Sequence, residues 1–262
     1  DHADPRRYAG PRYSVLVTSD PSLIESAQRL RYEVFSTEPG YTFDSDTALD
    51  ADRFDEFCDH LLVRDEYSGD IVGCYRMLPP PGAIAAGGLY TATEFDIRIL
   101  DPLRPSIVEM GRAVVRRDHR NGAVILIMWA GILAYLDRSG YDFVIGCVSV
   151  PTHGDGPAGA QLRGIRDVVL SRHRADYPVH PYRPVILDGR ALDDIAAPER
   201  TTMPPLLRGY LRLGAQVCGE PAHDPDFGVG DFPALLDKRR ADIRYLNRLR
   251  SAAAAGPEAA RR

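Results

Sequence analysis

The sequence predicts an α/β (α+β) fold of three layers, with a mixed central β-sheet, helices on both faces and a C-terminal elaboration. Short apolar runs suited to strands recur along the chain, and other segments place apolar residues at helical spacing. Residues 107–150 combine both patterns in one strand–helix–strand unit. The 262 residues, of which 44% are hydrophobic, suffice for a sizeable core.

The N-terminal part predicts a strand, a helix and two antiparallel strands. Alternation in "RYSVLVTS" indicates the strand, and Asp20 followed by Pro21 begins a helix through "SLIESAQRLRYEVF". Residues 37–53 are polar and acidic, which favours a long loop of the kind used for binding. The segment "CDHLLVRDEYSGDIVGCYRMLPP" then predicts two strands joined by a turn at Gly69.

The middle of the chain predicts a βαβ unit. After a short element in "GLYTATEFDI", the β-branched run "SIVEMGRAVV" suits a strand. We expect Asn121 to cap the helix "AVILIMWAGILAYL", which is apolar on nearly every side and so predicts a crossover helix buried against the sheet. The continuous apolar run "YDFVIGCVSV" is typical of a parallel strand covered on both faces.

The last third predicts further elements with a weaker pattern. We expect a helix in "PAGAQLRGIRDVVLSRHRA", a strand in "RPVILD", a helix running into a strand in "PPLLRGYLRLGAQVCG" and a closing helix in "DFPALLDKRRADIRYLNRL". The predicted domain covers residues 12–250, with its core at about 12–150 and the elaboration at about 151–250. Residues 1–11 are expected to be a flexible lead-in and 251–262 a disordered tail.

Composition excludes several classes of protein. A net charge of -5 argues against a nucleic-acid binder, because such domains carry a basic excess. The four cysteines form no CxxC pair, so neither a zinc site nor a redox motif is indicated, and we expect no bound metal. The apolar run at 123–136 is shorter than the roughly 20 residues that span a bilayer. The first ten residues lack the apolar core of a signal peptide, so a cytoplasmic location is expected.

The segment "RDHRNGA", from Arg117 to Ala123, lies where a strand passes into a helix. Backbone N–H groups at a helix start carry partial positive charge and can hold a phosphate, which neighbouring arginines reinforce. The turn therefore suits a pyrophosphate or phosphopantetheine phosphate. A solvated basic turn above a core helix remains an equal alternative. His119 in this turn is expected to be solvated and has no assigned role.

This segment resembles the acyl-donor motif of the GNAT superfamily of N-acyltransferases, (Gln/Arg)-x-x-Gly-x-(Gly/Ala). Arg117 and Gly122 match its outer positions, whereas Arg120 replaces the middle glycine and would narrow the groove for the pyrophosphate. The resemblance implies a sheet whose two central parallel strands part, with the thioester-bearing arm of the donor in the gap.

The chain also resembles the acyl-homoserine-lactone synthases through four motifs in the same order. These are Arg31 with Phe35, Asp52 with Phe54 and Asp55, Gly73 with Arg76 in "GCYRMLP", and Glu109 with Arg112. The closing segment "PPLLRGYLRLGAQVCGEPAHDPDFGVGDFPALLD" extends past that family and is similar to the ornithine N-acyltransferases, also labelled hemolysin-like. We favour the second family.

The resemblance assigns roles to residues of the central strand and turn. Glu109 is the candidate catalytic base, acting through water, with binding of the acceptor ammonium as the equal alternative. Arg112 shares a pocket with Glu109 only if the strand is irregular, since three residues along a regular strand reverse the face. The backbone N–H groups near Val114 and Val115 are candidate oxyanion donors, or ordinary ladder donors. The expected donor-binding residues are Val114, Val115, Arg117, Arg120, Asn121, Gly122 and Ala123.

The acidic and arginine motifs suit a zwitterionic acceptor. Carboxylates of Asp52 and Asp55 can bind an amine, and guanidinium groups of Arg31 and Arg76 can bind a carboxylate. The alternative is a surface ion-pair network. The expected acceptor-binding residues are Arg31, Phe35, Asp52, Asp55, Arg76 and Arg112.

The apolar residues leave the acyl site open. The helix at 123–136 favours core packing over an acyl tunnel, whereas Phe35, Phe54, Trp129 and Phe143 suit either. A basic helical stretch offers a docking face for an acidic acyl carrier protein, or a solvated face. That stretch contains Arg163, Arg166, Arg172 and Arg174.

The predicted function is an N-acyltransferase that moves a long, 3-hydroxylated acyl group from acyl carrier protein or acyl-CoA to the α-amine of a small amino acid such as ornithine. No permanently bound cofactor is expected, because the thioester is a co-substrate. A lipid product would favour peripheral association with the inner face of the membrane. The alternatives are an acetyl-CoA-dependent acetyltransferase, a lactone synthase and a non-catalytic protein that binds acyl thioesters.

Overall fold

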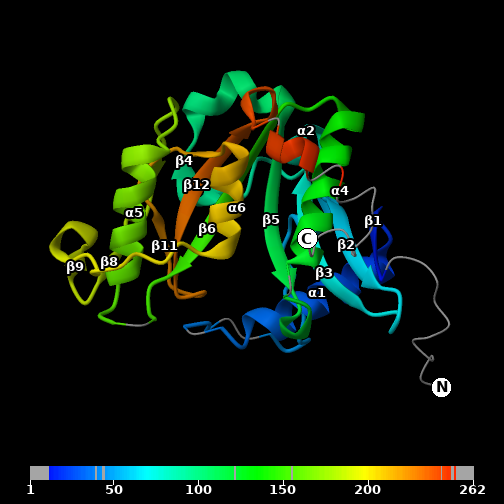
Figure 1. Cartoon of the computed structure of the whole chain (residues 1–262), viewed down its shortest axis with the longest axis horizontal. Coiled ribbons are helices and arrows are strands. Elements are labelled where there is room, and N and C mark those ends of the chain that lie inside the picture. The colour runs from blue at the N-terminus through cyan, green and yellow to red at the C-terminus, as the bar shows by residue number, and fades with distance from the viewer. Residues whose placement is uncertain are drawn as a thin grey trace.

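The fold is built on an eight-stranded mixed sheet, seen in a computed structural model that describes residues 12–38, 40–42, 45–120, 122–154, 156–242, 244–248 and 251 (Figure 1). The strand order is β1-β2-β3-β5-β6-β12-β10, and β11 pairs with β12. β5 and β6 are parallel, and the other pairs are antiparallel. The strands are β1 Tyr13–Thr18, β2 Asp59–Asp65, β3 Ile71–Leu78, β5 Ile107–Val115, β6 Phe143–Pro151, β10 Gln216–Val217, β11 Ala222–Asp224 and β12 Val229–Asp237.

Helices cover both faces of the sheet, as the sequence predicts. α4, α5 and α6 pack on one face, here the α4 face, and share the largest apolar cluster with it. α1, α2 and α3 lie on the opposite α1 face, over two smaller clusters. The helices are α1 Pro21–Phe35, α2 Pro80–Ala85, α3 Thr91–Glu94, α4 Ala123–Ser139, α5 Ala160–Arg172 and α6 Pro205–Leu213.

The remaining elements are short. Single-turn or irregular 3₁₀ segments occur at Asp55–Phe57, Arg98–Ser106, Arg117–His119, Leu192–Asp194 and Lys238–Arg240. Two small antiparallel pairs lie outside the main sheet, formed by β4 Phe95–Asp96 with β7 His180–Pro181 and by β8 Ile186–Leu187 with β9 Arg190–Ala191. In the described part of the chain, no helix is both long and apolar enough to cross a bilayer.

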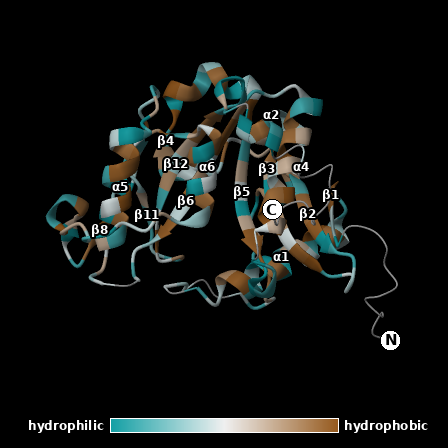
Figure 2. Ribbon diagram, in the orientation of Figure 1, coloured by the Kyte–Doolittle hydropathy of each residue, from teal (hydrophilic) through white to brown (hydrophobic). Residues whose placement is uncertain are grey.

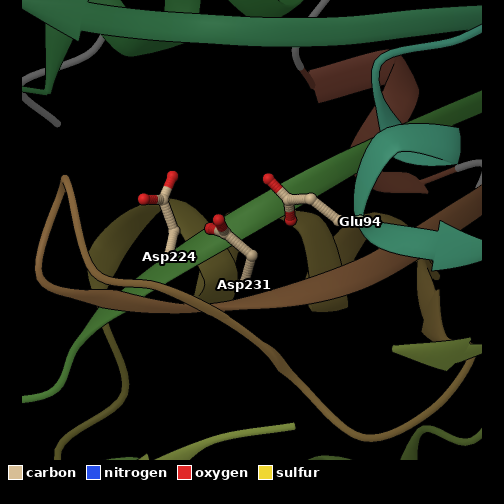
Figure 3. A group of neighbouring side chains, drawn as sticks. All are labelled: Glu94, Asp224 and Asp231. Carbon is tan, nitrogen blue, oxygen red and sulfur yellow. The ribbon is translucent and has the colours of Figure 1, made fainter. Parts of the chain in front are cut away.

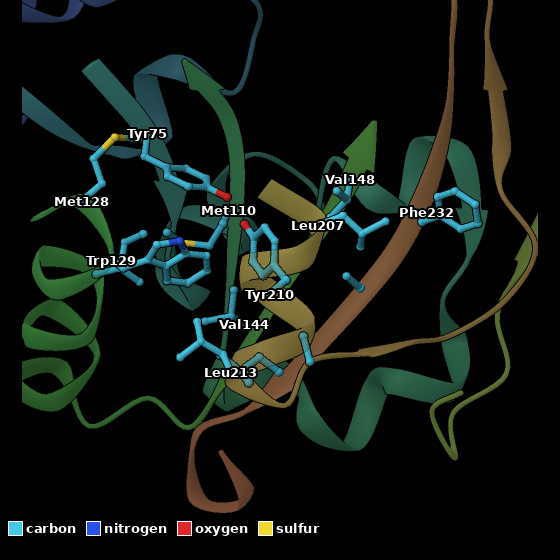
Figure 4. Close-up of a cluster of buried hydrophobic side chains, with 14 of the residues drawn as sticks. Tyr75, Met110, Met128, Trp129, Val144, Val148, Leu207, Tyr210, Leu213 and Phe232 are labelled. Atoms are coloured by element: carbon cyan, nitrogen blue, oxygen red, sulfur yellow. The ribbon is translucent and has the colours of Figure 1, made fainter. Parts of the chain in front are cut away.

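α4 is the crossover helix that the sequence predicts between β5 and β6. Its apolar side chains surround most of the helix and are buried in the cluster on the α4 face (Figures 2 and 4). Trp129, at 3% exposed, is part of this core. The core-packing interpretation of this helix is therefore confirmed.

β5 and β6 part beyond their first three paired residues. Ile107–Glu109 pairs with Phe143–Ile145, whereas β6 pairs with β12 along its whole length. At the point of separation, a Cβ added to Gly146 would lie 2.5 Å from the carbonyl oxygen of Met110. Only glycine fits this close approach, so the geometry of the opening depends on it.

Most predicted N-terminal and central elements are confirmed. The side chain of Asp20 caps α1 by accepting from the backbone N–H groups of Ser22 and Leu23. Gly69, with φ +83°, lies in the turn between β2 and β3. The N-cap of α4 is Gly122 at φ +83° with no side-chain hydrogen bond, whereas the sequence predicts Asn121 as the cap. Asn121 itself lies outside the described residues.

Two C-terminal predictions are wrong. The segment "DFPALLD" belongs to strand β12 rather than to a helix, and it is followed by the 3₁₀ turn Lys238–Arg240 and by α-helical structure at residues 244–248. Residues 230–236 are all buried because both faces of β12 are covered, so the two-residue alternation that marks a strand is absent. The segment "RPVILD" contributes only the two residues of β8 to a strand.

Candidate active site

A cavity of about 250 Å³ opens where β5 and β6 part, and residues of both sheet faces line it. Its polar half, on the α1 face, contains Arg76, Thr91, Glu109, Arg112, Asp224 and Asp231. Its aromatic half, on the α4 face, contains Tyr75, Met110, Leu206 and Tyr210. The opening in the sheet therefore joins a charged compartment to an apolar one.

Glu109 lies in the polar half, and the first residues of α3 hold its carboxylate. The backbone N–H groups of Tyr90 and Thr91 donate to it at 2.6 and 2.7 Å, and the Thr91 hydroxyl donates at 2.5 Å. Burial raises the pKa of Glu109, and the hydrogen bonds from Thr91 and Tyr90 offset part of that effect. The carboxylate is thus fixed in orientation beside the opening.

Arg112 shares the cavity with Glu109 because β5 is irregular. Arg112 has φ +52°, and the register between β3 and β5 shifts near Tyr75. This bulge turns Arg112 to the face of Glu109, as the sequence requires if both serve one pocket. The guanidinium lies 5.4 Å from the ring centre of Tyr90 and 5.1 Å from that of Phe227.

The arginine and acidic motifs form a buried ion network. Arg31 donates to Asp50 at 2.8 Å and to Asp55 at 2.8 Å, and Arg76 contacts Asp55 at 3.2 Å. Burial of Asp55 opposes its ionisation, but the hydrogen bond and charge of Arg31, the charge of Arg76 and the backbone N–H of Asp52 together lower its pKa. Arg31, 1% exposed, is too deep for the surface network that the sequence left as an alternative.

Asp52 completes this network at its more exposed end. It accepts from Arg76 at 2.6 Å and from Arg112 at 3.3 Å. Of the predicted acceptor-binding residues, Phe35, Arg76 and Arg112 line the cavity. Arg31, Asp52 and Asp55 lie behind this lining, where the two carboxylates hold Arg76 in place and Arg31 pairs with Asp55. Asp50, which also pairs with Arg112 at 3.2 Å, was missed by the sequence motifs.

The predicted phosphate-binding turn follows β5 at the start of α4. The Arg117 side chain donates to the carbonyl oxygen of Thr37 at 3.2 Å, and Arg120 donates to that of Val115 at 3.0 Å. His119 is buried at 4% exposed and lies 2.9 Å from the Tyr13 hydroxyl, so the expectation that it is solvated is wrong. Its ring packs edge-on against Tyr13 at 5.7 Å between ring centres, and its Nε2 lies 2.9 Å from Nη2 of Arg116.

The two candidate oxyanion donors differ in direction. The N–H of Arg116 donates to Val72 of β3 at 2.8 Å, and Cys74 of β3 is the register partner of Val114. Because successive N–H groups of a strand point to opposite edges, Val115 directs its N–H away from β3 and towards the gap beside β6. Val115 is therefore the better-placed donor of the two.

Two carboxylates of the polar half, Asp224 and Asp231, cluster with Glu94. Glu94 of α3, Asp224 of β11 and Asp231 of β12 have oxygen atoms within 4.8 Å of one another (Figure 3). The Ser149 hydroxyl donates to Asp231 at 2.6 Å. Among the described residues, Oε2 of Glu94 is buried without a hydrogen-bond partner. Burial, followed by neighbouring negative charge, raises the pKa of Glu94 to about 8.

Such a cluster suits a metal ion or an organic ammonium group. Burial also raises the pKa of Asp231 to about 6. The sequence offers no sign of the cluster, because its members come from three separate segments without a ligand-type spacing.

Comparison of the sequence with known proteins identifies a family and several relatives. Residues 30–130 match the family described as the acetyltransferase (GNAT) domain. An L-ornithine N(alpha)-acyltransferase of Brucella abortus (strain 2308) is 34% identical over 250 residues, which cover 89% of this chain and 87% of the relative. The chain belongs to the L-ornithine N(alpha)-acyltransferase family. A second member, from Rhodobacter capsulatus, is 33% identical over 249 residues, covering 86% of this chain and 90% of that relative.

Solved structures of acyl-homoserine lactone synthases share the fold of this protein. The CoA-dependent synthase BjaI has a TM-score of 0.55 at 17% identity and covers 95% of this chain and 92% of its own. The synthase LasI has a TM-score of 0.52 at 12% identity and covers 87% of this chain and 91% of its own. The predicted GNAT-like fold and family are confirmed, and the protein is an N-acyltransferase.

Two of the four arginines in the basic stretch, Arg163 and Arg166, form internal ion pairs. Arg163 contacts Asp167 at 2.8 Å, and Arg166 contacts Glu220 at 3.0 Å and also pairs with Asp193. These acids neutralise half of the predicted docking face for acyl carrier protein. Docking at this face stays a prediction.

Proposed function

We propose that the protein transfers a long-chain 3-hydroxyacyl group from acyl carrier protein or acyl-CoA to the α-amine of ornithine. The observation that carries this proposal is the two-part cavity, in which a charged compartment and an apolar one meet at the opening between β5 and β6. An amino acid suits the first compartment and a fatty acyl chain the second. The relatives in Brucella and Rhodobacter, named for ornithine acylation, support the same acceptor.

The donor would enter along the gap between β5 and β6. Its phosphates would lie at the turn of Arg117, Arg120 and Gly122, where two guanidinium groups stand beside the positive end of the α4 dipole. The thioester carbonyl would then lie near the N–H of Val115, which stabilises the developing oxyanion.

The acceptor would lie in the polar half. Among the described residues, Nη1 of Arg112 makes no hydrogen bond, although Nε and Nη2 lie close to Asp50 and Asp52. A guanidinium has five N–H donors, so Nη1 remains available to an acceptor carboxylate. The cluster of Glu94, Asp224 and Asp231 supplies negative charge for the side-chain ammonium of ornithine.

The chemistry needs one proton acceptor. The α-ammonium loses a proton, directly or through water, to Glu109, and the neutral amine attacks the thioester carbonyl. The tetrahedral oxyanion collapses, the carbon–sulfur bond breaks, and the thiolate leaves and takes up a proton as the amide forms. Glu109 is suited to this step because its raised pKa makes it a stronger base than an exposed carboxylate. The product is a lipid, which favours release at the inner face of the membrane.

A thiol-release assay tests this function. With 3-hydroxypalmitoyl thioester, on CoA or acyl carrier protein, we expect release that depends on ornithine and is much slower with norvaline, which lacks the second amine. Glu109→Gln should lower kcat by about 10²-fold or more, with the protein still folded by circular dichroism. Acetyl-CoA should be a poor donor.

Three outcomes would contradict the proposal. Efficient use of acetyl-CoA but not long-chain donors would indicate an acetyltransferase. Tight donor binding without thiol release would indicate a binding protein. Equal rates with ornithine and norvaline would exclude recognition of a diamino acid.

A further inference from the structure

Two buried tyrosines in the aromatic half of the cavity have hydroxyl groups without a protein partner. Tyr75 of β3 is 3% exposed and Tyr210 of α6 is 5% exposed, and both line the cavity. In the described part of the chain, neither hydroxyl makes a hydrogen bond, in contrast to Tyr135, whose hydroxyl donates to Asp59 at 2.7 Å. Buried tyrosine hydroxyls usually find a partner. Two that face the same cavity therefore indicate a polar group of a bound ligand.

The rings are held rigidly around Trp129. Tyr210 packs edge-on against Trp129 at 4.7 Å between ring centres, and Tyr75 does so at 6.5 Å. Figure 4 shows both side chains reaching from β3 and α6 towards Met110 of β5. Because packing fixes the rings, the two hydroxyl groups hold fixed positions in the cavity. The tyrosine side chains therefore lose little conformational entropy when a ligand binds.

The surroundings identify which part of the substrate these hydroxyls meet. Every charged residue that lines the cavity lies in the polar half, and Met110 and Leu206 flank the tyrosines. The aromatic half therefore receives the acyl chain rather than the amino acid. A plain alkyl chain would leave both hydroxyls without a hydrogen-bond partner once water is displaced, which weakens binding of that chain.

We propose that Tyr75 and Tyr210 are specificity-determining residues that hydrogen-bond a hydroxyl group on the acyl chain close to the thioester, as in a 3-hydroxyacyl donor. This inference rests on the proposed function and names the residues that select its donor. Tyr75 lies next to Arg76 at the register shift between β3 and β5, and it lines the cavity together with Met110, so the selected hydroxyl lies within the first carbons of the chain.

The preference for a hydroxylated acyl chain is measured with two donors that differ only in the 3-hydroxyl group. Rates of ornithine acylation are compared for 3-hydroxypalmitoyl and palmitoyl thioesters, each on CoA and on acyl carrier protein. The wild type should prefer the hydroxylated donor by about tenfold or more in kcat/KM. Tyr75→Phe and Tyr210→Phe keep the ring contacts with Trp129 and should each cut this preference by about threefold or more, through loss of rate with the hydroxylated donor alone. Tyr135→Phe, which removes a hydroxyl outside the cavity, should retain the preference.

Each other outcome is informative. Equal use of both donors by the wild type overturns this inference but leaves the proposed function intact, whereas absence of acylation with either donor overturns the function itself. An equal loss of rate with both donors in the phenylalanine variants also overturns the inference, because it indicates a general role such as protonation of the leaving thiolate. Preference retained in the double variant assigns the selection to other residues.

Discussion

At the scale of single residues, the reactivity of Glu109 depends on how α3 holds it. Three donors from Tyr90 and Thr91 fix its carboxylate while burial raises its pKa. The motif of Glu109 with Arg112 could be predicted from the sequence, and so could the need for an irregular strand between them. Thr91 could not, because it lies in a different segment and its contact arises only through folding.

The Thr91 hydroxyl should therefore tune the pH dependence. Its hydrogen bond lowers the pKa of Glu109 against the larger effect of burial. In Thr91→Ala that pKa rises further, so less Glu109 is deprotonated at a given pH. The acidic limb of kcat/KM should move to higher pH by about one unit. Thr91→Ser retains the hydroxyl and should keep the wild-type profile. An unchanged limb in Thr91→Ala would show that Glu109 is not the titrating base.

Other residues of the site lie beyond sequence reasoning for a similar cause. Asp50 joins Arg31 and Arg112 across separate segments, and Glu94, Asp224 and Asp231 meet only when α3, β11 and β12 come together. Ion pairs formed through space leave no fixed spacing in the chain. For the ion pairs of Asp50, the motifs contain only the arginine partners.

At the scale of elements, the site depends on how β5 and β6 part. The left-handed backbone at Arg112 and the close approach at Gly146 together create the opening. The strands themselves and α4 were predictable, because their apolar patterns are continuous and bounded by turn residues. β12 was not, since burial on both faces removed its alternation.

A side chain at Gly146 should force the two strands apart. In Gly146→Ala, the new Cβ would lie 2.5 Å from the Met110 carbonyl oxygen. We expect a loss of about 1–3 kcal/mol in the free energy of unfolding, measured with urea, and weaker binding of acyl-CoA. Gly111→Ala is the matched stability control, because a Cβ there meets nothing within 4 Å. Equal stability of the Gly146→Ala variant and the wild type would mean that the strands adjust freely at this point.

At the scale of the whole molecule, the C-terminal third builds the sheet and the cavity. β12 is a central strand beside β6, and α6 supplies Leu206 and Tyr210 to the aromatic half. The sequence predicted an elaboration after residue 151, but its motifs lie upstream and gave no information about this role. The relatives match this chain over most of their length, and so they contain both the N-terminal two thirds and the C-terminal third that form the cavity.

The most direct test of the two-part cavity is a crystal structure of the Glu109→Gln variant with 3-hydroxypalmitoyl-CoA and ornithine. We predict the pantetheine arm between β5 and β6, the acyl hydroxyl at Tyr75 and Tyr210, and ornithine between Arg112 and the cluster of Glu94, Asp224 and Asp231. An acyl chain on the α1 face, or a donor bound away from the opening, would contradict the account.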